Sequence, residues 1–223
     1  MAYSFNPSIA TNGLQFLADA GNLKSYPGSG TSWKDLSGNA NHTTLVNSPT
    51  FTSPYFVFDR TATVARVSSS IFNRTNGTEI SIVVWFYPQY NTGNYQMLAA
   101  NRLDMATYNW MLYQHTTDGA LSFHGSSQYK TTYIPTLNVW QQVIITVDTS
   151  GNSLMYVNGV LVRTTTGYTY GTGTSSSYLG IGAEPYLDEF FGGRISQVGI
   201  YNRVLSSFEA IQNYNATKGR YGL

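Results

Sequence analysis

The segment Trp140–Thr166, WQQVIITVDTSGNSLMYVNGVLVRTTT, contains strand, turn, strand, turn and strand in unbroken succession. At its start, Val143, Ile145 and Val147 are β-branched and occupy alternate positions. A period of two in β-branched residues is typical of a strand that is half-buried on a pleated surface. A short polar turn follows this strand, so the segment predicts antiparallel β-structure and is the strongest indication of fold in the chain.

The dipeptide Asn158-Gly159 predicts a two-residue hairpin turn within this segment. Both residue types accept the positive φ angles of a type I′ turn, and short apolar runs flank them. A two-residue turn also fixes which residues face each other across the hairpin. The predicted pairs are Val157 with Val160, Tyr156 with Leu161, Met155 with Val162 and Leu154 with Arg163.

Further strands are predicted along the whole chain. They are expected at residues 14–19, 43–46, 55–58, 62–67, 79–87, 96–101, 109–114, 120–124, 177–182 and 194–201. The run Glu79–Tyr87 is apolar at nearly every position and is stopped by Pro88, which predicts a central strand buried on both faces. About a dozen strands without an alternating βαβ rhythm favour an all-β fold, a two-sheet antiparallel sandwich.

One helix is predicted at the end of the chain. Ser206 and Glu209 have the spacing of a capping box, and Gly219 is expected to end the helix. A helix of about two and a half turns is unstable alone in water, so Phe208 and Ile211 are predicted to dock on a sheet.

Length and composition limit the function classes. The 223 residues fit one sandwich domain, with residues 1–12 as an N-terminal arm and residues 206–218 as a terminal helix and tail. Charged residues make up only 10% of the chain, with 12 Lys and Arg against 11 Asp and Glu. This balance provides no basic field for a phosphate backbone, so no nucleic-acid partner is expected. An uncharged surface with 18 Tyr favours glycan or protein contacts instead.

The chain has no Cys, which excludes a disulfide scaffold and thiol chemistry. Its opening residues lack the charged and apolar regions of a signal peptide, and no run of about 18 apolar residues occurs. We therefore expect no membrane insertion and no secretory signal. A location outside a cell would be reached by lysis or by assembly into a particle.

Several segments together resemble the laminin-G-like branch of the concanavalin A-like lectin/glucanase superfamily. They are Trp33–His42, Tyr55–Asp59, Trp140 with Leu154–Gly159, Phe191–Ile195 and Ile200–Ser206, in the order in which the family has them. Arg60 departs from the pattern, because many relatives have Gly after the Phe-Asp pair. The ending Asn213–Tyr221 further resembles laminin-G-like domains in structural proteins of tailed bacteriophages, marine ones especially.

The resemblance implies a jelly-roll sandwich of two curved sheets. Members of this family bind glycans, bind proteins, or decorate and trim larger assemblies, and the fold alone does not choose among these roles.

Catalytic groups are not evident in the sequence. The glycosidases of the superfamily carry a strand motif of the form Glu-x-Asp-x-x-Glu, because retaining hydrolysis needs two carboxyl groups about 5 Å apart. The nearest cluster, Glu184–Glu189, has other spacing and includes Pro185, so it is interpreted as a solvated acidic turn, with a cation or partner contact as the alternative. His42, His115 and His124 lack the spacing of a zinc site, and each is expected at the surface or in a hydrogen bond. The chain is therefore predicted not to be an enzyme.

Metal binding is a secondary hypothesis. In the loop around Trp33, Asp35 is expected to bond its own backbone in an Asx turn. The alternative is that Asp35, Asn39 and nearby carbonyl groups hold Ca²⁺, with Glu184 as a further candidate ligand elsewhere. No other cofactor is expected.

The candidate binding residues are aromatic. They comprise four tyrosines around a Gly/Ser/Thr-rich loop and one nearby acid, namely Tyr168, Tyr170, Tyr178, Tyr186 and Asp188. Flat apolar rings with a polar edge stack on sugars or anchor protein interfaces. A core-packing role is the alternative for these tyrosines, and it is the expected role of Trp110, Trp140 and Tyr156. Tyr108, Trp110 and Tyr113 crowd a single strand.

Two functions are favoured. The first is a non-enzymatic structural protein of a bacteriophage virion, as a capsid decoration or a tail or fibre component, which contacts other virion proteins and further copies of itself. The second is a free-standing, lectin-like module that binds carbohydrate, with Ca²⁺ dependence as an option. A polysaccharide-cleaving enzyme would become favoured only if two carboxyl groups faced each other in a concave groove.

Overall fold

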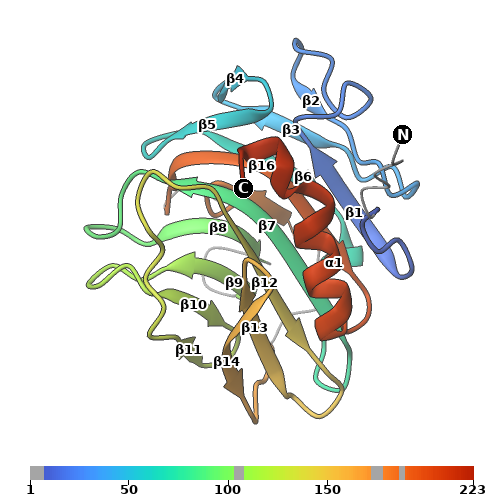
Figure 1. Ribbon diagram of the computed structural model, residues 1–223, viewed down its shortest axis with the longest axis vertical. Helices are drawn as coiled ribbons and strands as arrows, with labels where there is room; N and C mark the ends of the chain where they lie inside the picture. Colours follow the sequence, from blue (N-terminus) through green and yellow to red (C-terminus); the bar gives the residue numbers. More distant parts are fainter. Residues whose placement is uncertain (1–7, 103–107, 172–177, 186–188) are drawn as a thin grey trace, which may run out of the picture.

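The computed structural model describes residues 8–102, 108–171, 178–185 and 189–223, and within them the chain forms two antiparallel sheets packed face to face (Figure 1). In sheet A the strands run in the order β14 (Val160–Thr165), β13 (Ser153–Val157), β12 (Gln141–Val147), β7 (Ile80–Pro88), β16 (Gly192–Tyr201), β5 (Tyr55–Asp59) and β4 (Thr50–Thr52), with β1 (Leu14–Asp19) also paired to β16. In sheet B the order is β11 (Gln128–Lys130), β10 (Leu121–His124), β9 (Tyr108–Gln114), β8 (Gln96–Arg102), β15 (Tyr178–Ile181), β6 (Val64–Ser68), β3 (Thr43–Val46) and β2 (Ser32–Trp33). The predicted all-β, two-sheet antiparallel jelly-roll sandwich is confirmed.

The main core lies between the two sheets. Side chains at alternate positions of each strand fill it, including Val143, Ile145 and Val147 of β12, together with large rings such as Phe56 and Trp110. Burial of apolar side chains at about 25 cal/mol per Å² is the dominant stabilising term for such a layer.

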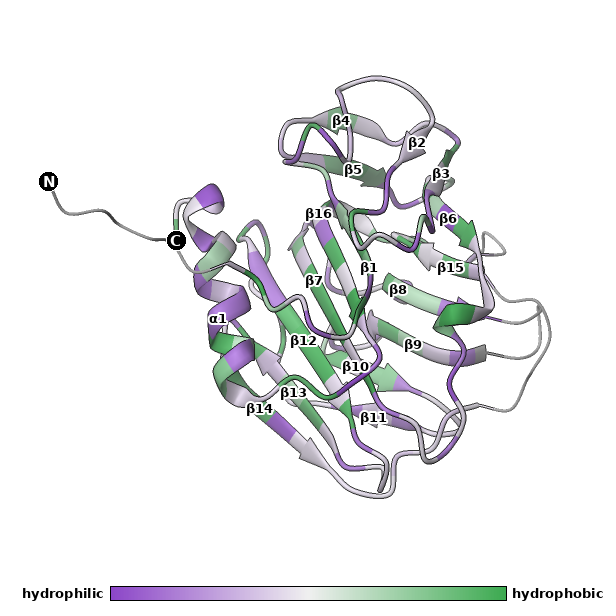
Figure 2. Cartoon of the chain, turned by 90° about the vertical axis from the view of Figure 1, so that its right-hand side faces the viewer, coloured by the Kyte–Doolittle hydropathy of each residue, from purple (hydrophilic) through white to green (hydrophobic). Residues whose placement is uncertain are grey.

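Strand β12 corrects one prediction. It was expected to be half-buried, but all seven of its residues are buried. Ile144, on the face that points away from the main core, packs in a second cluster with Tyr156, Leu205 and Ala210. The second face is buried because the helix α1 (Ser207–Thr217) covers it (Figure 2).

The hairpin between β13 and β14 has the predicted turn but only half of the predicted register. Asn158 and Gly159 both have positive φ, 51° and 78°, as a type I′ turn requires. Val157 pairs with Val160 and Tyr156 with Leu161, as predicted. A bulge then shifts the ladder, so that Met155 pairs with Arg163 and Leu154 with Thr164. An extra residue on one strand has this effect on every pair beyond it.

The capping box at Ser206 is confirmed, but the predicted docking residues of the helix are wrong. The Ser206 hydroxyl accepts from the Glu209 amide, and the Glu209 carboxylate accepts from the Ser206 amide. Phe208 is 74% exposed and Ile211 is 47% exposed, whereas Ala210 is fully buried. The helix therefore docks with its small and polar residues, together with the rings that follow them.

Trp85 of β7 explains this choice of docking face. Its ring stacks on Tyr214 at 5.6 Å between centroids, and its Nε1 donates to the Thr217 hydroxyl at 2.7 Å. Tyr221, in the short 3-10 turn η2 (Lys218–Tyr221), packs on the same indole at 4.3 Å. The contact between helix and sheet is therefore centred on Trp85, with Tyr214, Thr217 and Tyr221 around its indole.

A second 3-10 turn, η1 (Ser70–Phe72), follows β6 and brings Phe72 into the main core. Arg60 follows β5 with φ of 68°, in the left-handed region that Gly adopts most readily. Its guanidinium lies 4.5 Å above the Tyr90 ring and donates to the Thr92 carbonyl. No helix among the described residues is long and apolar enough to cross a membrane.

Candidate functional site

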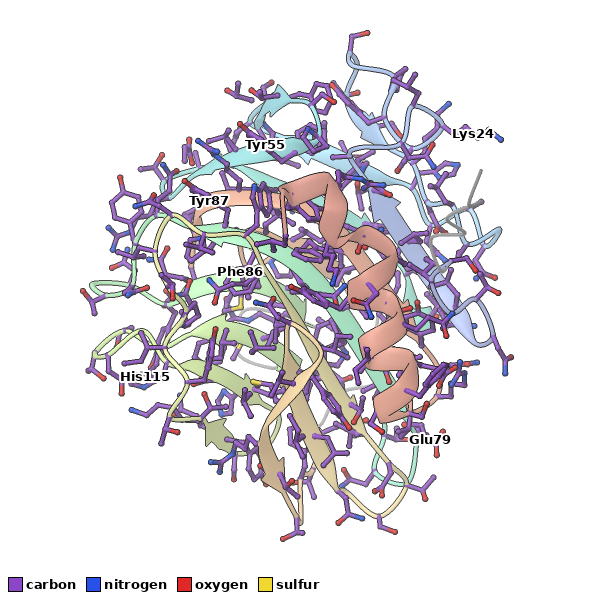
Figure 3. The ribbon with its side chains drawn as sticks, viewed as in Figure 1. Lys24, Tyr55, Glu79, Phe86, Tyr87 and His115 are labelled. Atoms are coloured by element: carbon purple, nitrogen blue, oxygen red, sulfur yellow. The ribbon has the colours of Figure 1, made fainter. Side chains whose placement is uncertain are left out.

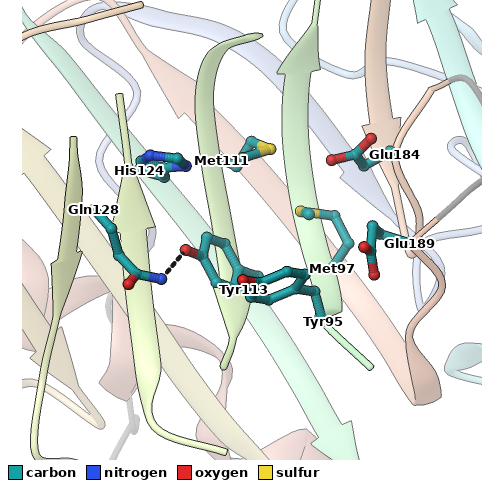
Figure 4. Close-up of a pocket in the computed structure, with 8 residues that line it drawn as sticks. All are labelled: Tyr95, Met97, Met111, Tyr113, His124, Gln128, Glu184 and Glu189. Atoms are coloured by element: carbon teal, nitrogen blue, oxygen red, sulfur yellow. Dashed lines mark hydrogen bonds between the residues drawn. The ribbon is translucent and has the colours of Figure 1, made fainter. Parts of the chain in front are cut away.

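The outer face of sheet B carries a groove of about 300 Å³. Eight residues line it, namely Tyr95, Met97, Met111, Tyr113, His124, Gln128, Glu184 and Glu189. The first six lie on or beside the neighbouring strands β8, β9, β10 and β11, and Figure 4 shows the two glutamates together at the opposite end from Gln128.

Alternation along the strands brings these side chains together. In β9, Trp110 and Leu112 point into the main core, so Met111 and Tyr113 lie on the outer face. In β8, Leu98 belongs to the core and Met97 to the outer face. The floor of the groove is therefore apolar and packed.

Aromatic rings and hydrogen-bonding groups lie above this floor. Tyr95 and Tyr113 meet edge to face at 5.2 Å, and Tyr95 meets His115 in the same way at 5.6 Å. The Gln128 amide donates to the Tyr113 hydroxyl, which fixes both side chains (Figure 4). Burial lowers the pKa of His124 below its ordinary value, so its imidazole is neutral at pH 7.

Glu184 corrects the interpretation of residues 184–189 as a solvated acidic turn. Glu184 is only 4% exposed, and its carboxylate forms an ion pair with Arg102, which is 8% exposed. The Glu184 amide donates to the Glu189 carbonyl at 3.2 Å, so the two acids stand on paired segments at the edge of the groove. The sequence could not reveal this ion pair, because Arg102 lies at the end of β8, far from Glu184 in the chain.

The residues predicted for binding fall into three groups in the structure. Tyr178 is partly exposed and lines a second hollow on the outer face of sheet B. Tyr168 and Tyr170 are 3% and 4% exposed and belong to the main core, so the expectation that they stand on a loop without apolar neighbours is corrected. Tyr186 and Asp188 lie outside the described residues.

Tyr168 is buried because other rings meet it from several sides. It stacks on Phe123 at 4.9 Å, with Tyr129 at 5.1 Å and Tyr170 at 5.3 Å. Its hydroxyl donates to the His124 carbonyl, and that of Tyr170 donates to the Thr78 carbonyl. Burial raises the pKa of both phenols, so they remain neutral donors.

Other aromatic predictions have mixed outcomes. Trp110 is fully buried and Tyr156 is 4% exposed, as expected for packing residues. Trp140 instead lies partly exposed on the outer face of sheet A, where its ring contacts Tyr221, Tyr55 and Tyr87. Figure 3 labels Tyr55 and Tyr87. Arg194 spans the last two rings, at 4.8 Å and 4.5 Å from their centroids. The side chain of Tyr108 is outside the described part.

The loop around Asp35 is closed by its own hydrogen bonds. The Asp35 carboxylate accepts from the amides of Leu17, Ser37 and Asn41 and from the Ser37 hydroxyl. Asn39 is exposed and donates through its amide to the Gln15 carbonyl. This is the predicted Asx-type loop beside a buried Trp33. Among the described residues, no group of three or more His, Cys, Asp or Glu could hold a metal ion.

Sequence reasoning singled out neither the groove nor most of its lining. Tyr113 was noted only as one ring on a crowded strand, and Tyr95, Met97, Met111, Gln128 and Glu189 were not noted as site residues. A usable signal was present, because β8 and β9 have large side chains at both alternations. Large residues on the outer alternation of a strand in a two-layer fold require a cover or form a surface site.

Comparisons with known proteins agree with this architecture. A laminin-G family model, described as the concanavalin A-like lectin/glucanases superfamily, matches residues 59–210. A search of curated proteins found no match. Domain 4 of AbnA, an extracellular arabinanase of Geobacillus stearothermophilus solved with arabinotriose, is similar at 18% identity with a TM-score of 0.69, covering 90% of this chain and 98% of that domain.

Two larger proteins contain a similar domain. Trypanosoma rangeli sialidase is 15% identical with a TM-score of 0.72, and the match covers 95% of this chain but 34% of that one. The binding domain of Botulinum neurotoxin DC, solved with rat synaptotagmin II, is 14% identical with a TM-score of 0.68, covering 92% of this chain and 52% of that one. At these identities the likenesses show the fold. Since the family model spans more than half of the 223 residues, the chain belongs to the concanavalin A-like lectin/glucanases superfamily, in its laminin-G family.

Proposed function

We propose that this chain is a non-enzymatic binding domain whose groove on the outer face of sheet B holds a carbohydrate. The observation that carries the proposal is the grouping of Tyr95 and Tyr113 with Gln128, His124 and two glutamates over an apolar floor. Sugars present both apolar C–H faces and hydroxyl groups, so a site for them combines rings with hydrogen-bonding groups. The volume of about 300 Å³ is at the lower end of ordinary ligand sites.

The fold neighbours are compatible with this role. The similar arabinanase domain was solved with arabinotriose, and it matches this chain over nearly its whole length. The neurotoxin binding domain was solved with a protein partner, which supports protein contacts as a second use of the same fold.

The groove proposal can be tested with one substitution and a matched control. Tyr95→Ala removes a partly exposed ring from the groove, and Tyr55→Ala removes a partly exposed ring from the opposite outer face. Titration calorimetry with glycans selected from an array, including arabinotriose, should show at least about tenfold weaker binding for Tyr95→Ala only. Equal weakening in both variants, or no glycan binding by the wild type, would refute the groove as a carbohydrate site.

The same array with and without a chelator tests the Ca²⁺-dependent alternative. Because the protein's own amides and a hydroxyl occupy the Asp35 carboxylate, we expect binding to be unchanged by chelation. Loss of binding in chelator, restored by Ca²⁺, would favour the Ca²⁺-dependent lectin.

Hydrolysis is the second candidate function, because Glu184 and Glu189 both line the groove. A retaining glycosidase needs a carboxylic acid that can donate a proton to the glycosidic oxygen. It also needs a second carboxylate about 5 Å from that acid. Glu184 is buried and engaged by Arg102, which opposes its use as that donor. We therefore expect chromatography to detect no cleavage of array-selected oligosaccharides after long incubation with the protein. Turnover that disappears in Glu189→Gln would establish the enzyme instead.

We further propose a place in a bacteriophage particle, as a capsid decoration or as part of a tail or fibre, present in several copies. The support is the resemblance of Asn213–Tyr221 to phage laminin-G-like domains, together with a charge content of only 10%, which suits extensive protein contacts. Mass spectrometry of purified particles, followed by imaging with a labelled antibody, tests this placement. Absence of the chain from the purified particles would contradict it.

A further inference from the structure

A second hollow of about 450 Å³ lies on the outer face of sheet B, apart from the groove. Its lining comes from β3, β6, β15 and the loop before β3, and comprises Ala40, Asn41, His42, Thr44, Val46, Arg66, Val67, Ser68 and Tyr178. The Glu184-Pro185 segment separates the two sites. It crosses over β15 at Gly180, where an added Cβ would lie 2.4 Å from the Ala183 carbonyl and 2.8 Å from the Pro185 nitrogen.

Among the described residues that line the hollow, Arg66 is the only one with a permanent charge, and none is Asp or Glu. Its Nη1 donates to the Pro185 carbonyl at 3.0 Å, and its guanidinium lies 5.1 Å above the Tyr178 ring. These contacts fix the guanidinium plane but provide no negative charge, and among the described residues no carboxylate forms an ion pair with it. A guanidinium has five N–H donors in a planar fork that suits a carboxylate or a sulfate.

His42 supplies a second donor. Its Nδ1 accepts from the Asp35 amide at 3.1 Å, so the neutral ring carries its proton on Nε2. The ring is exposed, and the hydroxyl groups of Thr44 and Ser68 stand on neighbouring strands of the same hollow. The described side chains around Arg66 therefore offer hydrogen-bond donors, and none of them is a carboxylate.

The two hollows differ in charge. The described lining of the groove includes Glu184 and Glu189, whereas that of the second hollow includes Arg66 and no acid. Since the whole chain has a formal charge of only +1, long-range attraction cannot give it a general preference for anions. A preference for anionic ligands would have to arise at Arg66. The volume also exceeds that needed by a bare ion and is in the range of sites that hold a sugar-sized ligand.

We propose that this hollow is a subsite for an acidic sugar, in which Arg66 binds a carboxylate or sulfate group while His42 and the neighbouring hydroxyl groups bind the ring substituents. The proposal rests on the carbohydrate-binding role proposed above, and it adds the ligand class, a saccharide with a negative charge. Tyr178 acts as a positioning residue, because its ring supports the guanidinium.

The experiment compares trigalacturonate with its neutral methyl ester, and galactose 6-sulfate with neutral galactose, by titration calorimetry. Inorganic sulfate serves as a bare-ion competitor. The wild type should bind at least one acidic member about tenfold more tightly than its neutral counterpart, as expected for one charge-assisted contact. Arg66→Gln should abolish that difference, and Arg66→Lys should retain part of it. The control Arg163→Gln removes a partly buried arginine from sheet A and should leave it unchanged.

The outcomes separate the two proposals. Equal affinity for acidic and neutral forms, or an acidic preference that survives Arg66→Gln, would overturn the acidic subsite while leaving the groove intact. Competition by inorganic sulfate at the same concentration as the saccharide would overturn the sugar class of the ligand. An Arg66-dependent preference that is insensitive to Tyr95→Ala would uphold the subsite and refute the groove.

Discussion

The two outer faces of this sandwich differ in how far other elements cover them. On sheet A, helix α1 and the turn after it cover the strands, so β12 is buried on both sides. On sheet B, no helix among the described residues lies over the strands (Figure 2). That face carries both the groove and the Arg66 hollow. The covered face therefore contributes stability, and the open face is available to ligands. The comparison predicts that substitutions on sheet A mainly change the free energy of unfolding, whereas substitutions on sheet B mainly change binding.

The largest effect is expected at Trp85, the ring beneath the helix. Trp85→Ala removes a fully buried indole and its bond to Thr217, so the free energy of unfolding should fall by about 3–5 kcal/mol. Urea denaturation measures this change. The control Trp140→Ala, on the same face but partly exposed, should cost less. A loss below about 1 kcal/mol for Trp85→Ala would mean that the helix does not stabilise sheet A.

The next effect is expected at Gly180, beneath the segment between the two hollows. An added Cβ would meet the Ala183 carbonyl at 2.4 Å, so Gly180→Ala should displace residues 183–185. Overpacking of this kind costs about 1–3 kcal/mol. Because Glu184 and Pro185 form part of the two sites, glycan binding should weaken as well. Unchanged binding in a destabilised variant would show that this segment does not shape either hollow.

A smaller, pH-dependent effect is expected at the start of the helix. Hydrogen bonds from Arg203, followed by those from Ser206, lower the pKa of Glu209 to about 2. A carboxylate with a lowered pKa stabilises the fold above its unfolded pKa of about 4.5, and that contribution is lost as the pH falls from 4.5 through 2.

Glu209→Gln should therefore lower stability by about 1 kcal/mol at pH 7, the usual size of a capping contact, and by less as the pH approaches 2. Thermal unfolding followed by circular dichroism across this pH range checks the prediction. Asp118→Asn, on the sheet B side, is the surface control and should change little because solvent screens its pair with Lys130. If the difference in stability between wild type and Glu209→Gln is the same at every pH, the lowered pKa of Glu209 does not stabilise the fold.

The smallest effect is expected at Phe208, on the exposed side of the same helix. Phe208→Ser should change the free energy of unfolding by no more than about 0.5 kcal/mol, since the ring is 74% exposed. Ala210→Ser, which places a hydroxyl in the buried contact, should cost about 1–3 kcal/mol. A larger loss of stability for Phe208→Ser than for Ala210→Ser would show that Phe208 docks on the sheet, as the sequence predicts.

The local features of the sequence predicted the fold well. Asn158-Gly159 specified its turn and the capping box specified the start of the helix, because these signals depend on backbone conformations within a few residues. The Met155–Arg163 pair could not be predicted, because a bulge depends on the neighbouring strands rather than on the turn. The binding residues were predicted less well. Tyr168 and Tyr170 looked exposed in a polar loop, but rings from distant strands enclose them.

The sequence by itself determined most of the strands, the hairpin turn, the capped helix and the inward alternation that builds the main core, since each follows from residues close together in the chain. The short strands β2, β4 and β11 were not predicted. Only the tertiary structure decided which outer face is covered, which glutamate meets Arg102 and where Arg66 lies without an acidic partner among the described residues. These outcomes depend on contacts between segments far apart in the sequence. Period-two alternation predicts which residues share a face of a strand, but not which other segments of the chain pack against that face.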